Sequence, residues 1–342
     1  MRIRVSDYFE QFQCLAGDCP HTCCAKWEVV IDEETAERYQ QVTGPLGEKL
    51  RAELRRDEDG DFCFALRGGR CPFLEERDLC EIHLQLGEEA TSVTCREHPR
   101  FIEDYGPFRE ITLSASCPEA NRLLLASREP LTFREWEDGE ECEEGDEWLT
   151  WLLPLRQRML DQLSDRTRPL WARLGEILAL SREAQLCLEE ERTEDIPALT
   201  ATWTPERRSA AGGGEGLFPG ALEALAELEI LEPDWPELLA AAAERERIAG
   251  EEERLERIAA YFLFRYLLKA VNDGDLLGRV QLCVLSVLVV ARLAAVCGLE
   301  EALRRFSCEI EHSDANLDAL LEAFWQSETF SFERFENELS AI

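Results

Sequence analysis

The spacing of the cysteines constrains this chain more than any other feature of its sequence. Nine of the fourteen cysteines lie within the first 117 of 342 residues. Eight of these nine form two groups along the sequence, Cys14, Cys19, Cys23 and Cys24, and then Cys71, Cys80, Cys95 and Cys117. Thiolates select zinc, Cu(I) or iron–sulfur clusters over hard cations. The N-terminal third is therefore predicted to bind a soft metal through these eight side chains.

A disulfide framework is the alternative use of so many cysteines. It requires an oxidising compartment and is typical of small secreted domains with a signal peptide. The first ten residues contain no apolar segment and no small-residue cleavage site,. Adjacent Cys23 and Cys24 also favour metal binding, because neighbouring thiols seldom meet the geometry of a bridge. We therefore expect a cytoplasmic protein with reduced, metal-binding cysteines.

The gaps between the cysteines favour an iron–sulfur cluster over zinc. No Cys-x2-Cys pair typical of structural zinc sites occurs, whereas Cys19, Cys71 and Cys117 are each followed by proline, as in ferredoxin ligand runs,. A cubane cluster needs four thiolates. Eight candidates therefore leave open two metal sites, one cluster with four further cysteines around it, or one cluster and a zinc ion. His21, inside the first group, is either a further ligand or an exposed loop residue.

Charge and hydropathy limit the partners of the chain. The net charge of −34 argues against binding to nucleic acid or to anionic lipid headgroups and favours a basic partner,. The most apolar stretch, 280–296, contains Gln281 and Arg292 and is too short and too polar for a membrane span,. We expect a buried core helix there, with weak peripheral membrane contact as the alternative.

Residue patterns along the chain predict a mostly helical α+β fold in two domains. Residues 1–125 are expected to form a small, loop-rich cysteine-cluster domain with short strands, and the charge-dense segment 126–147 an acidic linker,. Apolar residues at three-and-four spacing predict a larger all-helical domain over 148–342, with a flexible loop near 190–216,. Its later helices are expected at 219–231, 236–248, 251–271, 276–297, 299–307 and 314–340, the last one interrupted.

Several short motifs around the cysteines resemble one known family. They are Tyr8-Phe-x-x-Phe12-x-Cys14, Cys19-x3-Cys23-Cys24-x2-Trp27, Cys71-Pro-Phe-Leu74, Leu79-Cys80-x-Ile82, Leu86-Gly-Glu88, Cys95-Arg96-x-x-Pro99-Arg100 and Ser116-Cys117-Pro-Glu-Ala120. In this order and density, over residues 8–124, they resemble the flagellin lysine-N-methylase family and the wider group of zinc- or iron-chelating cysteine-cluster proteins. In the C-terminal half the resemblance is looser and rests on 261–266 and 272–275.

This resemblance implies methyl transfer from S-adenosylmethionine to lysine side chains of flagellin or another lysine-bearing protein, with a [4Fe-4S] cluster held by the eight cysteines. No Gly-x-Gly-x-x-Gly follows a predicted strand, so a Rossmann-type cofactor site is not expected,. The residues themselves leave two other functions open. One is a structural or interaction protein whose zinc or iron–sulfur site is not catalytic, and the other is an electron-transfer module.

Some further residues have both a functional and a structural interpretation. Tyr8, Phe12 and Trp27 are expected to shield a cluster or to belong to the core. Arg96 and Arg100 are expected to pair with a carboxylate or a cluster, or to make structural ion pairs. Two roles are open for a further group of residues, either contact with substrate or cofactor or a place in a helical core stripe with a capped end. These residues are Tyr261, Tyr266, Asp273 and Asp275,.

Overall fold

The computed structural model describes residues 1–25, 29–57, 60–204, 216–218 and 220–342, which form two compact units. The first, here called the helical unit, comprises Met1–Glu10, Ile102–Thr112 and Arg122–Ile342. The second, the cysteine-rich unit, comprises Gln11–Phe101 and Leu113–Asn121. Helices predominate and the sheets are small, so the predicted mostly helical α+β fold is confirmed.

The cysteine-rich unit consists of short elements around a small core. Strands β2 (Val30–Ile31), β4 (Phe62–Phe64) and β3 (Leu54–Arg56) form an antiparallel sheet in that order. The helices are η1 (Phe9–Gln11, at the boundary), η2 (Ala16–Asp18), α1 (Glu33–Gln41), α2 (Gly44–Glu53), α3 (Glu81–Leu86), η3 (Glu88–Ala90), α4 (Val93–Glu97) and α5 (Pro118–Leu125, which runs on into the helical unit). The predicted strand at 27–31 is partly present as β2, and Trp27 lies outside the described residues.

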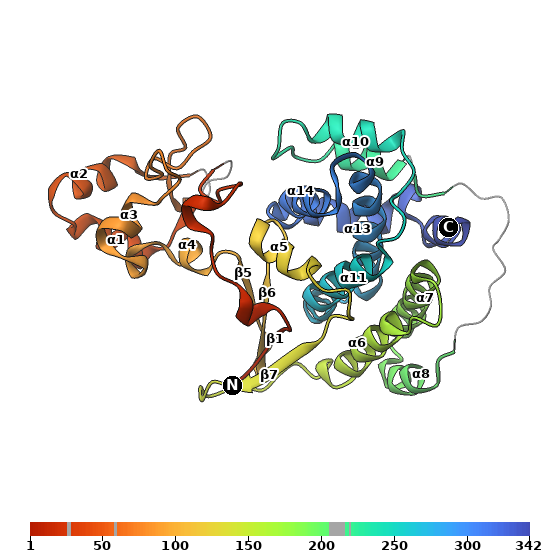
Figure 1. Ribbon diagram of the computed structural model, residues 1–342. Helices are drawn as coiled ribbons and strands as arrows, with labels where there is room; N and C mark the ends of the chain where they lie inside the picture. Colours follow the sequence, from red (N-terminus) through yellow and green to blue (C-terminus); the bar gives the residue numbers. More distant parts are fainter. Residues whose placement is uncertain (26–28, 58–59, 205–215, 219) are drawn as a thin grey trace. The chain divides into compact units, whose positions relative to one another are not determined.

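A four-stranded sheet belongs to the helical unit. Its order is β5 (Arg100–Asp104), β6 (Phe108–Leu113), β1 (Arg2–Ser6) and β7 (Phe133–Glu137). β1 runs parallel to β6, with Val5 opposite Ile111, and antiparallel to β7, with Arg4 opposite Glu135. The two strands β1 and β6 lie side by side in Figure 1 although about a hundred residues separate them along the chain,.

This sheet changes the predicted boundaries. The first ten residues and β6 were expected in the N-terminal domain and β7 in an acidic linker at 126–147, but all of them contribute to the helical unit. The pairing of β1 with β6 and β7 is non-local, and the alternation of side chains in a five-residue strand does not reveal its partner. The cysteine-rich unit is therefore inserted between strands of the helical unit rather than placed before it.

The described part of 148–342 contains helices and no strand. Its elements are α6 (Leu149–Ser164), α7 (Leu170–Glu189), η4 (Thr193–Asp195), α8 (Ile196–Thr202), α9 (Gly220–Ala226), α10 (Trp235–Ala243), α11 (Glu252–Tyr266), η5 (Leu267–Lys269), α12 (Ala270–Asp273), α13 (Leu276–Cys297), α14 (Leu299–Glu311), α15 (Asp314–Gln326), η6 (Glu328–Phe330) and α16 (Phe332–Ala341). The predicted loop near 190–216 contains η4 and α8, and its residues 205–215 lie outside the described part.

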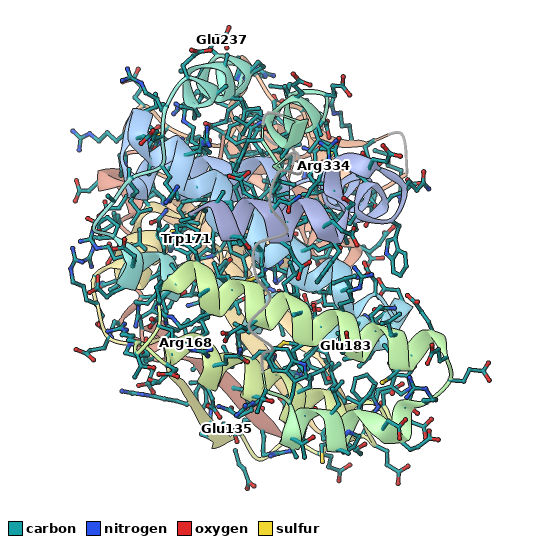
Figure 2. The ribbon with its side chains drawn as sticks, turned by 90° about the vertical axis from the view of Figure 1, so that its right-hand side faces the viewer. Glu135, Arg168, Trp171, Glu183, Glu237 and Arg334 are labelled. Atoms are coloured by element: carbon teal, nitrogen blue, oxygen red, sulfur yellow. The ribbon has the colours of Figure 1, made fainter. Side chains whose placement is uncertain are left out.

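α13 forms the centre of the helical unit. It contacts α7, α10, α11, α14 and α15, and Figure 1 shows it among these blue and green helices. Its length and apolar composition match those of a membrane span, but 78% of its apolar window is buried inside the unit. The predicted buried core helix is confirmed. Charged side chains such as Glu183 on α7 and Glu237 on α10 point outward (Figure 2).

A buried ion pair joins the sheet to the helices. Glu110 on β6 accepts hydrogen bonds from both terminal nitrogens of Arg156 on α6, one at 2.6 Å. Arg156 also donates to the carbonyl of Phe264 at 3.0 Å, and Arg4 on β1 donates to Glu110 at 2.9 Å. Both charges are compensated, which burial of a charge requires.

Removing one partner of this pair is expected to be costly. E110A leaves the Arg156 guanidinium buried without its carboxylate and should lower the free energy of unfolding by about 3–5 kcal/mol. The double variant E110L/R156M should recover most of that loss, because it removes both charges. The exposed pair of Glu10 and Arg134 is the control, since E10A should cost less than about 1 kcal/mol,. Urea unfolding followed by circular dichroism measures all three, and equal effects of E110A and E10A would contradict the argument.

Candidate metal centre in the cysteine-rich unit

All eight cysteines of the two sequence groups lie in the cysteine-rich unit. Seven come from its long segment, Gln11–Phe101, and Cys117 comes from the short segment after β6. All eight are reduced, and they are intermediate in exposure or exposed. Their electrostatic interactions group them differently from their order in the sequence.

One set contains Cys24, Cys71, Cys80 and Cys95, which interact electrostatically with one another. The backbone explains part of this grouping. The N–H of Cys71 donates to the carbonyl of Cys24 at 2.9 Å, and Leu74 pairs with Cys80 where the chain turns back. The set therefore combines one cysteine of the first sequence group with three of the second.

Cys95 is positioned by a carboxylate that caps two helices. Asp32 is the N-cap of α1, where its Oδ1 accepts from the N–H of Thr35 at 2.9 Å. Its Oδ2 accepts from the N–H of Val93 at 2.9 Å, in the first turn of α4. Arg38 on α1 adds a hydrogen bond to the carbonyl of Glu89 at 3.0 Å. α1 and the helix that carries Cys95 are thus held together at their N-termini.

The other set contains Cys14, Cys19 and Cys117. Cys117 interacts electrostatically with Cys19 and Cys14, although about a hundred residues lie between them. The reason is topological, because β1 and β6 are parallel neighbours and the chain leaves both strands at the same end of the sheet,. Cys14 then follows β1 and Cys117 follows β6.

Contacts within the unit support this placement. The guanidinium of Arg100 lies 5.5 Å from the ring centre of Phe12, and the N–H of Ser114 donates to the carbonyl of Pro99 at 2.7 Å. The thiol of Cys19 donates to the backbone carbonyl of His21 at 3.3 Å. Cys23 lies between the two sets, since it interacts with Cys24 by a hydrogen bond and electrostatically with Cys14 and Cys95.

Most of these thiols resist ionisation in this environment, and Cys24 is the exception. Burial, followed by the charge of neighbouring thiols, raises the pKa of Cys71 to about 12. The hydrogen bond between Cys23 and Cys24 lowers the pKa of Cys24 to about 7 and raises that of its neighbour. A bound cation would lower the pKa of a thiol that coordinates it, because a coordinating thiol loses its proton outright.

An apolar core lies behind the first set. Tyr39, Phe64 and Phe73 belong to the core cluster of the unit, and Cys71 and Cys80 pack against it. The rings of Tyr39 and Phe64 stack at 5.9 Å, and those of Phe64 and Phe73 are 4.6 Å apart. The hydroxyl of Tyr39 is buried and has no hydrogen-bond partner among the described residues. Apolar shielding of this kind controls solvent access and potential at metal sites.

By their chemistry the thiol donors suit an iron–sulfur cluster or zinc. All eight thiols lie in one unit. Within the described part of the chain, no three side chains of His, Cys, Asp or Glu are arranged as the ligands of a single metal ion. The eight predicted site residues therefore share a region, and their role as ligands stays a prediction.

Other predicted residues have structural roles. Tyr8 is buried in the helical unit, whereas Phe12 belongs to the cysteine-rich unit. Arg96 donates to the backbone carbonyls of Thr91 and Glu89 and so supports the loop before α4. Asp275 caps α13 by accepting from the N–H of Gly278 at 2.8 Å, which matches the expected capped end.

Tyr261 and Tyr266 surround a buried carboxylate that the sequence did not reveal. Glu311 accepts from the hydroxyls of both tyrosines, from Nε of Arg265 at 3.0 Å and from the hydroxyl of Ser307. Four donors satisfy the four acceptor positions of a carboxylate. The interpretation of the two tyrosines as helical core is therefore favoured over contact with substrate. Arg265 and Glu311 are 46 residues apart in the sequence, so helical periodicity does not indicate that they form an ion pair.

The helical unit contains the part of the chain that matches a known protein family. Residues 156–335 match the family described as the FliB lysine N-methylase C-terminal domain. This match lies within the helical unit and covers more than half of the chain, and the chain belongs to this family. The resemblance predicted from the sequence is thus confirmed. The eight candidate metal-binding cysteines precede the matched region.

Curated relatives carry related names. A lysine-N-methylase of Salmonella typhimurium (strain LT2) is 25% identical over 134 residues, which is 37% of this chain and 33% of that protein. The flagellar biosynthetic protein FliU of Salmonella muenchen is also 25% identical over 134 residues, which is 79% of its length. The aligned part thus spans about a third of the first relative. No solved structure matches the chain.

The double cap of Asp32 has a testable dependence on pH. Burial of this carboxyl is outweighed by hydrogen bonds from Val93 and Thr35, which hold its pKa below the ordinary 3.8. A carboxyl with a lowered pKa contributes stability above its unfolded pKa and loses it as the pH falls. D32A should therefore lower the free energy of unfolding by about 1–2 kcal/mol at pH 7, and the difference from the natural chain should shrink below pH 3.8.

Ser92 provides the matched control for this prediction. Its hydroxyl caps α4 alone by accepting from the N–H of Cys95 at 3.2 Å. S92A should have a smaller effect, and that effect should not change with pH because a hydroxyl does not titrate in this range. Urea unfolding at pH 7 and pH 3 measures both variants. A loss in D32A that stays constant between these pH values would show that the ionised carboxylate is not the cap.

Proposed function

We propose that this chain is a protein-lysine N-methyltransferase that uses S-adenosylmethionine and an iron–sulfur cluster, with flagellin or another lysine-bearing protein as substrate. Membership of the FliB lysine N-methylase C-terminal domain family is the observation that carries this proposal. The names of the relatives, lysine-N-methylase and flagellar biosynthetic protein, support the reaction and the flagellar substrate.

The charge of the chain supports a basic substrate. With 71 acidic against 37 basic residues, the protein attracts positively charged segments and repels nucleic acid,. A lysine side chain approaches such a surface as an ammonium ion. Long-range attraction of this kind raises the rate of encounter and weakens with ionic strength.

The proposed reaction moves one methyl group. The bond between the methyl carbon and the sulfonium sulfur of S-adenosylmethionine breaks, and a bond between that carbon and the lysine nitrogen forms. S-adenosylhomocysteine leaves, and the lysine nitrogen loses a proton. The sequence contains no Rossmann glycine motif after a predicted strand, so another mode of cofactor binding is required,.

The cysteine-rich unit would supply that other mode. An iron–sulfur cluster held there by thiolates on three of its four irons would supply a coordination position for the sulfonium cofactor. Three of the four thiols of Cys24, Cys71, Cys80 and Cys95 would then hold the group, and Cys71 and Cys80 pack against the apolar core. The second set, Cys14, Cys19 and Cys117, lies in the same unit and would provide further ligands, with Cys23 between the sets.

The first test is the composition of the protein itself. After anaerobic purification, about four irons and four sulfides per chain are expected for a cubane, with a paramagnetic resonance signal that changes on addition of S-adenosylmethionine. Zinc without sulfide would instead support a structural metal site. Iron and sulfide with no response to S-adenosylmethionine would support an electron-transfer module.

Substitution of a cysteine in the first set should remove both cluster and activity. C71S should lose its iron and its methyl transfer to flagellin lysines, measured by mass spectrometry of tryptic peptides, down to background. C142S is the matched control, because Cys142 is an exposed cysteine of the helical unit outside both sets. Methyl transfer by iron-free C71S at the rate of C142S would contradict a cluster-dependent methylase.

A further inference from the structure

The cysteine-rich unit has a cleft on its surface between two loops. The loops are residues 15–18 and 76–79, and the cleft has a volume of about 530 Å³. Both loops belong to the long segment of this unit. Binding sites for small molecules usually have volumes of about 300–1,000 Å³. The cleft is therefore of a size that accommodates a metabolite or a cofactor.

The two loops approach each other closely at Gly17. A Cβ atom at this position would lie 2.9 Å from the carbonyl oxygen of Arg77 and 3.4 Å from Cδ2 of Leu79. The first of these contacts is with backbone, so a side chain at position 17 would push the loops apart. The absence of a side chain thus allows the loops to form one continuous wall.

Each loop also contains a residue in the left-handed backbone region, which non-glycine residues seldom adopt. The φ angle is +48° at Ala16 and +57° at Asp78, and the described residues include one further case. Hydrogen bonds close the two turns, because the N–H of Asp18 donates to the carbonyl of Leu15 and that of Asp78 to the carbonyl of Glu75, both at 3.0 Å. The shape of the cleft is therefore fixed by the backbone.

The cleft presents unpaired charges of both signs. Asp78 forms an ion pair with Arg70. The carboxylates of Asp18 and Glu76 and the guanidinium of Arg77 form no hydrogen bond or ion pair within the described part of the chain. All three side chains are exposed. Two negative groups and one positive group are thus available to a ligand.

These groups are complementary to S-adenosylmethionine. The cofactor carries a positive ammonium group, a positive sulfonium and a negative carboxylate. Two carboxylates can face its positive groups, and a guanidinium binds a carboxylate through two parallel hydrogen bonds. Leu15 and Leu79 line the same cleft and provide apolar surface for the adenine ring. The chemistry of the lining residues therefore fits this cofactor.

The cleft also adjoins thiols of the unit. The N–H of Ala16, which lines the cleft, donates to the sulfur of Cys14 at 3.4 Å. Cys19 directly follows the first loop, and Cys80 directly follows the second. A cofactor in the cleft would thus lie next to the segments that carry these three cysteines.

We propose that the cleft between 15–18 and 76–79 binds S-adenosylmethionine. Asp18 and Glu76 face its ammonium and sulfonium groups, and Arg77 pairs with its carboxylate. The inference rests on the proposed function for the identity of the ligand, and it does not require a metal in the protein. It assigns the cofactor site to a position other than a Rossmann glycine loop, which the sequence lacks after its predicted strands,.

Calorimetric titration of the anaerobically purified full chain with S-adenosylmethionine tests this site. D18N/E76Q should raise the Kd about tenfold, because both positive groups of the cofactor lose their partners. R77Q should raise it about fivefold through the loss of one ion pair. The three side chains are exposed, so the variants should keep the unfolding temperature of the natural chain,.

Glu34 and Glu37 provide the matched control. Both are exposed residues of α1 in the same unit, outside the cleft. E34Q/E37Q removes the same number of negative charges and so weakens long-range attraction comparably, but it should leave the Kd unchanged. Equal losses of affinity in E34Q/E37Q and D18N/E76Q would indicate general charge attraction and would overturn the assignment of the cleft.

Two analogues of the cofactor test which charge each side chain meets. Decarboxylated S-adenosylmethionine lacks the carboxylate, so R77Q and the natural chain should bind it equally well. S-adenosylhomocysteine lacks the sulfonium charge, so D18N/E76Q should weaken its binding less than that of S-adenosylmethionine. Each comparison is a double-mutant cycle between protein and ligand. A fivefold loss in R77Q for the decarboxylated analogue as well would contradict the role of Arg77.

Failure of this inference differs from failure of the proposed function. If the natural chain, D18N/E76Q and R77Q all bind S-adenosylmethionine equally well, the cofactor site lies elsewhere and the proposed function stands. If the natural chain does not bind S-adenosylmethionine, the proposed use of this cofactor fails and the inference fails with it. Methyl transfer to flagellin is a second readout, in which the variants should raise the KM for the cofactor and keep kcat close to its natural value.

Discussion

The parallel pairing of β1 with β6 is the constraint on which the arrangement of this chain depends. Val5 lies opposite Ile111, and the chain leaves both strands at the same end of the sheet. Parallel strands need a crossover, so the chain must return to the opposite end of the sheet before it enters β6, and β5 makes that return,. This makes the cysteine-rich unit an insertion with both of its ends anchored in the sheet. It also explains why Cys117 interacts with Cys14 and Cys19, which follow β1.

Within that insertion, hydrogen bonds between short elements contribute much of the stability that a large apolar core contributes in other folds. The core cluster is small, and the elements around it are short. Asp32 connects α1 and α4 through two backbone N–H groups, which places Tyr39 and Cys95 on adjacent helices. A unit with so little apolar burial would gain much stability from a metal if it binds one, because metal binding contributes directly to folding. The helical unit has a different basis, since α13 is buried among helices that contact it along its length.

The observations that bear on function come from both units. The match to the FliB lysine N-methylase C-terminal domain lies in the helical unit, and the candidate metal ligands lie in the cysteine-rich unit. The buried carboxylate of Glu311 shows how the helical unit balances its charges. Its hydrogen bonds to Tyr261, Tyr266 and Arg265 occupy the side chains that the sequence singled out in that region. The side chains around Glu311 already satisfy one another, so the thiols of the cysteine-rich unit are the better candidates for a catalytic role.

The sequence by itself determined the mostly helical class, the core helix at 276–297 and the family, because apolar periodicity and cysteine motifs are local properties of the chain. It also named the thiols that gather in one unit. Only the tertiary structure decided that Cys24 interacts with Cys71, Cys80 and Cys95, that β7 replaces part of an expected linker, and that Asp32 caps both α1 and α4. These features depend on strand pairing and helix capping between residues far apart in the chain. Residue spacing and hydropathy do not indicate which distant strand a strand pairs with, or which distant N–H group a capping side chain binds.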